Sequence, residues 1–249
     1  MKRPQIILSI FITVLALTAY SFVNQKENEM LFEPVELKFP FDINSRFSNT
    51  ITKEGLKDAQ TIHDLLPTTK LLPMNSYYNV SIQAYSEQCQ MGIPQIGHDG
   101  KLSYAQKELL QSLDYGSNFY ISAREKSLYP SIGCQSNDSL IYYITVVPHK
   151  QAFYSEGKEE LISYLEENSQ NVWVDLQSGQ LKPGKIHFVV TGEGNIEEVR
   201  LSSSSGFESI DNKMINLIQN LHGKWNGALD AKGEKVDEEL VLSFGMIGC

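Results

Sequence analysis

The stretch that decides the fold begins with Gly184-Lys-Ile-His-Phe-Val-Val190, turns at Gly192-Glu-Gly-Asn195 and continues through Ile196-Glu-Glu-Val-Arg-Leu201. The alternating pattern on either side of a glycine-containing turn predicts an antiparallel hairpin. In its first strand Ile186, Phe188 and Val190 share one face, while His187 and Val189 share the other. We therefore expect one face of the hairpin to be buried against another element.

A helix and one more strand follow the hairpin. Between Ile210 and Leu221 four apolar residues recur at helical spacing, namely Met214, Leu217, Ile218 and Leu221. The segment from Val236 to Phe244 then predicts a closing strand, and a helix over 159–167 precedes the hairpin. This order predicts an α+β domain over residues 148–249, an antiparallel sheet with a packed helix.

The closing strand is the candidate binding site. A sheet that ends on an exposed strand can bind a partner by accepting the partner's backbone as one more strand. The expected binding residues are Val236, Asp237, Glu238, Glu239, Leu240, Val241, Leu242, Ser243 and Phe244. The three carboxylates would border the incoming strand and disfavour acidic peptides.

The preceding residues predict a second, smaller domain. Alternating segments over 78–85, 118–123 and 140–147, with a capped helix over 103–113, predict a β-rich, sandwich-like domain at 76–147. Residues 24–75 predict an irregular lead-in or linker. It contains one helical stretch, for which Thr52 is a candidate N-cap and Pro67 the stop.

The N-terminus has the pattern of an export signal. Lys2 and Arg3 precede an uncharged, apolar stretch from Ile6 to Val23. Eighteen residues are marginal for spanning a bilayer, which takes about 20. Residues 1–23 are therefore either a cleaved signal peptide or an uncleaved signal anchor, and both alternatives stay open. In either case the remainder is expected in the periplasm or outside the cell.

The net charge of −9 argues against a nucleic-acid partner, which would require a basic surface. Of the three cysteines, Cys89 and Cys134 are a candidate disulfide in an oxidising compartment, and three independent thiols are the alternative. The five histidines lack the spacing of metal ligands. No nucleophile elbow or dinucleotide fingerprint is present. We expect no catalytic residues, no metal and no cofactor.

Two resemblances to known families add to these inferences. The run from Gly100 to Ala123 resembles the β-sandwich repeats of the GldM gliding-motility family of Bacteroidetes. The C-terminal residues resemble the TonB C-terminal domain of Bacteroidetes energy transducers. The matching elements stand in the family's order: the strand from Gly184, the Gly192 hairpin, Ser204-Ser-Gly-Phe207 with Ile210-Asp211, Lys224-Trp225 with Gly233-Glu-Lys-Val236, and the closing strand.

The TonB resemblance implies a periplasmic module that binds the TonB box of an outer-membrane TonB-dependent transporter by strand addition. It also implies an inner-membrane, proton-driven partner complex that supplies energy for transport. Three features differ from the family pattern: few prolines between 24 and 75, no His in the apolar segment, and Asn226-Gly227 after Trp225. The alternative is an envelope protein that uses this fold for docking without energy coupling. Whether two copies pair through the same strand stays open.

Overall fold

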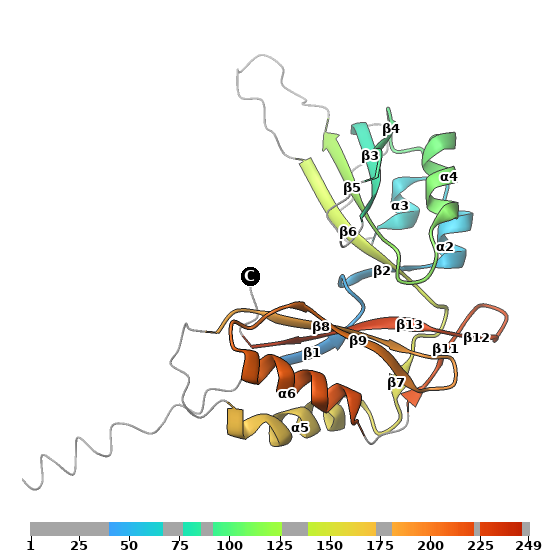
Figure 1. Cartoon of the computed structure of the whole chain (residues 1–249). Coiled ribbons are helices and arrows are strands. Elements are labelled where there is room, and N and C mark those ends of the chain that lie inside the picture. The colour runs from blue at the N-terminus through green and yellow to red at the C-terminus, as the bar shows by residue number, and fades with distance from the viewer. Residues whose placement is uncertain are drawn as a thin grey trace, which may run out of the picture. The chain divides into compact units, whose positions relative to one another are not determined.

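The computed structural model describes residues 40–66, 77–85, 92–125, 139–172, 181–221 and 225–245. They form two main sheets with helices packed on each, an α+β fold in which most strand pairs are antiparallel (Figure 1). The predicted export signal, residues 1–23, and both cysteines of the candidate disulfide lie outside these residues. None of the described helices is both long and apolar enough to cross a membrane.

The first sheet has four antiparallel strands in the order β1-β13-β8-β9. Their bounds are Phe41–Asn44 for β1, Glu238–Phe244 for β13, Gly184–Val190 for β8 and Ile196–Ser203 for β9. The predicted hairpin between β8 and β9 is confirmed. Its turn is closed by the amide of Gly194, which donates to the carbonyl of Thr191.

One face of this sheet is buried by α5, Lys158–Ser169, and α6, Glu208–Gln219. Ile186, Phe188 and Val190 have no exposed surface, as the alternation predicted. Met214 and Ile218 meet them from α6 and are equally buried, while Leu221 is partly buried. Burying each large apolar side chain contributes about 1.5–3 kcal/mol, so this face holds the domain together.

Short strands extend the domain beyond its main sheet. β7, Phe153–Tyr154, pairs with β10, Trp225–Asn226. The Trp225 ring packs edge-on against Phe188 and Tyr154, with centroid distances of 5.8 and 5.6 Å. β11, Ala228–Leu229, pairs with β12, Lys235–Val236, and a 3₁₀ turn over Gln170–Val172 follows α5. Asp237 interrupts the predicted closing strand, because only residues from Glu238 onward pair with β8.

The second sheet has five strands in the order β2-β6-β5-β3-β4. Their bounds are Asn49–Thr52 for β2, Ser139–Val147 for β6, Asn118–Glu125 for β5, Tyr77–Tyr85 for β3 and Gln95–Gly97 for β4. β2 runs parallel to β6, and the other pairs are antiparallel. The three strands predicted in this region are confirmed.

Helices cover one face of the five-stranded sheet (Figure 1). They are α2, Lys53–Asp58, α3, Ile62–Leu65, and α4, Tyr104–Ser112. Ser103 caps α4 in a capping box with Gln106, as the pattern predicted. The sandwich-like prediction is wrong here, since the apolar face of the sheet packs on helices rather than on a second sheet.

The irregular lead-in is also wrong for its described part, residues 40–66. This segment supplies β1 to one sheet and β2, α2 and α3 to the other. Thr52 caps α2 as predicted, accepting a hydrogen bond from the Gly55 amide. The expected single helix divides because Thr61 and Asp64 form a capping box that starts a new helix.

The packing of the β8–β9 turn is tested by comparing Gly194, which lies in that turn, with Gly233, which lies between β11 and β12. Gly194 and Gly233 both have positive φ, 83° and 81°. A Cβ on Gly194 would lie 2.1 Å from the backbone oxygen of Trp225, whereas one on Gly233 would meet nothing within 4 Å. We expect Gly233→Ala to cost about 1–2 kcal/mol of unfolding free energy and Gly194→Ala about 1–3 kcal/mol more. Urea denaturation measures both, and equal losses would contradict the packing.

Candidate functional site

Strand β13 lies inside its sheet, between β8 and β1. The prediction that Val236 to Phe244 form an exposed edge strand is therefore wrong. β1 pairs antiparallel with β13, placing Phe41 opposite Phe244 and Asn44 opposite Val241. The physical reason is that Phe41 and Ile43 alternate and bury their side chains in the core.

β1 covers only part of β13. It pairs with Val241–Phe244, four of the seven residues of β13. Within the part of the chain that the structure describes, no strand pairs on this side with Glu238–Leu240. After Asn44 the chain leaves the sheet and reaches β2 at Asn49. The site predicted as an open edge is therefore an edge that the protein itself partly occupies.

A pocket of about 430 Å³ opens where β1 ends. Its walls include Ile43, Asn44 and Ser45 from the end of β1, and Leu240, the first residue of β13 beyond the paired positions. Tyr154, Leu161 and Trp225 add aromatic and aliphatic surface. A strand on β13 that continued past the position of Asn44 would run along this pocket.

The three carboxylates do not form the predicted charged border, since each has a partner within the chain. Asp237 accepts a hydrogen bond from the Gly192 amide at 2.8 Å. Glu238 is 3% exposed and accepts from the Ala152 amide at 2.6 Å and from Gln151 at 2.9 Å. Glu239 is engaged on the other face of the sheet. These contacts position loops and strands rather than present charge to a partner.

Glu238 is a buried acid whose pKa is raised. Burial is the main cause, because it penalises the charged form, and the hydrogen bonds from Ala152 and Gln151 only partly offset it. Gln151 also donates to the Ser45 hydroxyl at 2.8 Å. The Gln151 side chain, from the segment after β6, thus links Glu238 of β13 to Ser45 just after β1.

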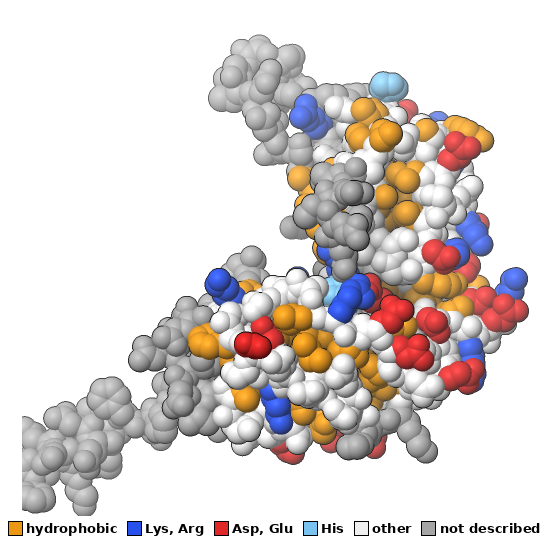
Figure 2. Space-filling model, in the orientation of Figure 1, with side chains coloured by type: hydrophobic (Ala, Val, Ile, Leu, Met, Phe, Trp, Pro, Cys, Tyr) orange, Lys and Arg blue, Asp and Glu red, His pale blue; other side chains and the backbone are white. Residues whose placement is uncertain are grey.

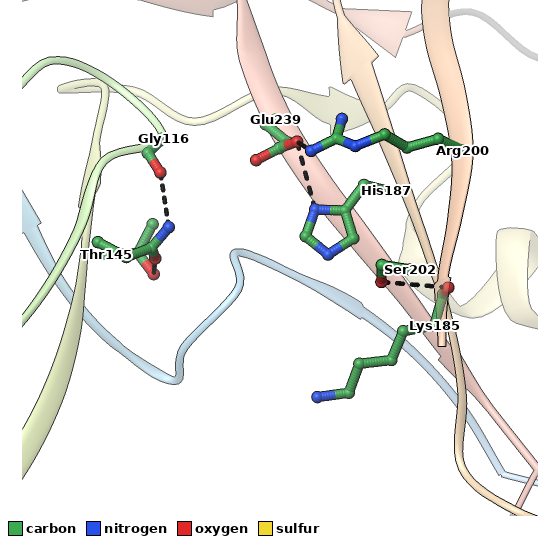
Figure 3. Close-up of polar contacts among 8 residues, drawn as sticks. Gly116, Thr145, Lys185, His187, Arg200, Ser202 and Glu239 are labelled. Carbon is green, nitrogen blue, oxygen red and sulfur yellow. Dashed lines mark hydrogen bonds and ion pairs between the residues drawn. The ribbon is translucent and has the colours of Figure 1, made fainter. Parts of the chain in front are cut away.

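Glu239 lies at the centre of a polar network on the face of the sheet opposite α5 and α6 (Figure 3). Its Oε1 atom is 2.6 Å from Nη2 of Arg200 on β9 and 3.2 Å from Nδ1 of His187 on β8. Burial alone would raise the pKa of Glu239, but the contacts with His187 and Arg200 outweigh it and lower that pKa. This three-strand network was missed from the sequence, where His187 was assigned only a face.

The outer edges of this sheet are β1 and β9. β9 is a poor acceptor for another strand because its pairing with β8 is irregular at two places and Glu198 has a φ of 51°. Such irregularities bend an edge and interrupt its row of backbone groups. The four-residue β1 is the shortest strand of the sheet and the one whose replacement disturbs the fewest pairs.

Compared with known proteins, the chain matches no family model, no curated protein and no solved structure. The resemblance to the TonB C-terminal domain therefore stays a prediction. Among the described residues, no three His, Cys, Asp or Glu side chains come together as metal ligands. The site is characterised by strand pairing and a pocket.

Glu238 and Glu239 are neighbours that should respond to pH in opposite ways. The pKa of Glu238 is higher in the folded state than its ordinary value of 4.5. Glu238 therefore reduces the stability of the native state as the pH rises above 4.5. A lowered folded pKa makes Glu239 contribute stability above 4.5, which is lost as pH falls through its folded pKa.

We expect the stability advantage of the native chain over Glu238→Gln to shrink between about pH 4.5 and pH 7. Its advantage over Glu239→Gln should instead grow from about pH 3 to pH 6. Urea denaturation at these pH values gives the differences. Parallel pH profiles for the two variants would show that the two environments are not as described.

Proposed function

We propose that this protein is a TonB-like binding protein of the bacterial periplasm, which takes an extended segment of an outer-membrane transporter as an added strand on β13. In the free protein β1 occupies this position, and the partner segment replaces it. The observation that carries the proposal is the partial cover of β13, in which a four-residue strand fills an edge of seven residues.

Strand exchange is supported by the small number of contacts that it breaks. Each backbone hydrogen bond between β1 and β13 contributes about 0.5–1.5 kcal/mol net, because the freed groups bond to water or to the new strand. The partner forms equivalent bonds with the same β13 groups. The net cost is then the loss of two buried side chains, Phe41 and Ile43, which the partner's own apolar residues replace, and of the exposed contacts that Lys158 makes with β1.

The pocket beside β1 favours a partner strand longer than β1. Side chains alternate along a strand, so an incoming segment would direct every second residue toward α5 and the core, where Phe41 and Ile43 now lie. A segment that continued opposite Leu240 would gain the pocket surface of Trp225 and Leu161. The expected partner therefore alternates apolar and polar residues over more than four positions.

A disulfide that locks β1 onto β13 tests this proposal. Asp42 and Ser243 are directly paired, and both side chains are partly exposed, so Asp42→Cys with Ser243→Cys should form the bond without entering the core. The oxidised double variant should lose binding to a synthetic peptide spanning the TonB box of an outer-membrane transporter. Reduction should restore it, since the cause is the trapped strand.

Two variants serve as controls for the lock. Ser243→Cys alone should bind like the native chain in both redox states, because it leaves the ion pair between Asp42 and Lys158 of α5 in place. Ile43→Asp, which weakens the docking of β1, should bind more tightly, because less free energy is needed to vacate β13. Unchanged peptide binding by the oxidised double variant would mean that the partner does not use this edge.

The alternative is a docking protein of the cell envelope that uses the same edge without energy coupling. The two differ in the fate of the apolar N-terminal segment. A transducer requires residues 1–23 as an anchor, so an intact mass lacking residues 1–21 would favour the docking protein. Either outcome leaves binding at β13 to be decided by the disulfide lock.

A further inference from the structure

A second cavity lies on the polar face of the four-stranded sheet and shares Phe47 with the pocket beside β1. Its volume is about 670 Å³, within the range of sites that hold a drug-sized ligand or a few residues of a peptide. Lys185, His187, Arg200 and Val241 of the sheet line it on one side. Arg46 and aromatic residues line the other, and we call this cavity the basic cleft.

The basic cleft differs in charge from the protein as a whole. Its lining contains Arg46, Lys185 and Arg200 but no Asp or Glu from the described part of the chain. Glu239 pairs with Arg200 from the next strand and offsets that charge, and Arg46 also has partners, so Lys185 supplies the exposed cation of the cleft. The chain carries a net charge of −9, so a positively charged cleft is a local concentration against the overall trend.

Acidic side chains gather elsewhere, at the end of the sheet marked by β11 and β12 (Figure 2). Glu193 and Glu234 are exposed there, and Asp230 is partly exposed. Glu193 is paired there with Lys235 at 2.7 Å, which leaves Glu234 and Asp230 as the acidic groups at that end. Separated charges of this kind orient a partner during its approach.

The wall opposite Lys185 is aromatic. Arg46 stacks over the Tyr85 ring at 4.8 Å, and Phe47 lies 5.2 Å from the ring of Tyr143. Tyr143 also lines the cleft and is 45% exposed, so its ring is accessible to a ligand. The basic cleft therefore combines fixed cations with accessible aromatic surface.

We propose that the basic cleft binds an acidic peptide segment of another protein, whose carboxylates meet Lys185 and Arg46 and whose apolar side chain packs on Tyr143. Figure 3 shows the Lys185 side chain extending away from the Glu239 pair, so its ammonium is directed elsewhere than to that carboxylate. The hydroxyl of Ser202 donates to the Lys185 carbonyl at 3.3 Å, and this bond helps to hold the Lys185 backbone in place. This site borders β13, whose Val241 lines it, but the peptide that it binds does not form a strand on β13.

Peptide binding to the full chain tests this inference. The probe is an acetylated, amidated hexapeptide, Glu-Phe-Asp-Leu-Glu-Gly, and its neutral counterpart is Gln-Phe-Asn-Leu-Gln-Gly. Isothermal titration should show at least about tenfold weaker binding of the neutral peptide, equal to about 1.4 kcal/mol. Affinity for the acidic peptide should also fall when salt rises from about 0.05 to 0.3 M.

Two matched substitutions locate the site. Lys185→Glu should weaken binding of the acidic peptide about tenfold or more, since Lys185 lines the cleft and is exposed. Lys182→Glu makes the same charge change at an exposed position outside the lining and should have less than about a twofold effect. Tyr143→Ala should weaken the acidic and the neutral peptide alike.

Three results would overturn the proposal: no binding of the acidic peptide at about 1 mM, equal binding of the acidic and neutral peptides, or equal effects of Lys185→Glu and Lys182→Glu. The last would indicate attraction to the surface in general. Because no variant here alters the β1–β13 pairing, failure of this test leaves the disulfide-lock result unaffected.

Discussion

The pairing of β1 with β13 is the constraint on which the rest of the structure depends. β1 is the first described element of the chain, and it pairs with the C-terminal strands rather than with the five-stranded sheet. Only four residues separate Asn44, its last residue, from β2 of the five-stranded sheet. The same short segment carries Arg46 and Phe47, which line the basic cleft. A single four-residue strand therefore fixes the edge of one sheet, the start of the other and one wall of a cavity.

This dependence gives the proposed binding a physical cost and a consequence. When a partner strand replaces β1, the segment that follows it loses its anchor, and Arg46 and Phe47 lose their fixed position. A ligand held in the basic cleft would favour the state in which β1 is docked, because that state holds Arg46 in place. By thermodynamic linkage, a partner on β13 would weaken the cleft to the same degree. Phe47 lines both the pocket beside β1 and the basic cleft, so the two proposed sites share one movable segment.

Much of the C-terminal sheet could be predicted from the sequence because its apolar residues follow clear periods. Apolar residues alternate along β8 and recur at helical spacing along α6, and this spacing predicted which side chains are buried. They are Ile186, Phe188 and Val190 on β8, and Met214, Leu217 and Ile218 on α6. The strand order could not be predicted in the same way. β1 has only two apolar residues, directly follows Pro40, and pairs with a strand about 200 residues away, so no local pattern identifies its partner.

The charged residues show the same limit. The run from Asp237 to Glu239 resembles an exposed acidic border, yet its three side chains have three different environments: a turn amide, a buried pair of donors, and the contacts with His187 and Arg200. Partners that lie tens of residues away decide these environments. The basic cleft was missed for a related reason, since Arg46, Tyr143 and Lys185 come together only through the fold.

Hydrogen–deuterium exchange followed by NMR along β1 and β13 tests the central claim most directly. In the free protein, the inter-strand amides of β1 should be protected, though less than those between β8 and β13, because the short strand opens more readily. With a bound transporter segment, β1 should lose its protection while the amides of β13 keep theirs. Protection of β1 that persists in the complex would contradict strand exchange.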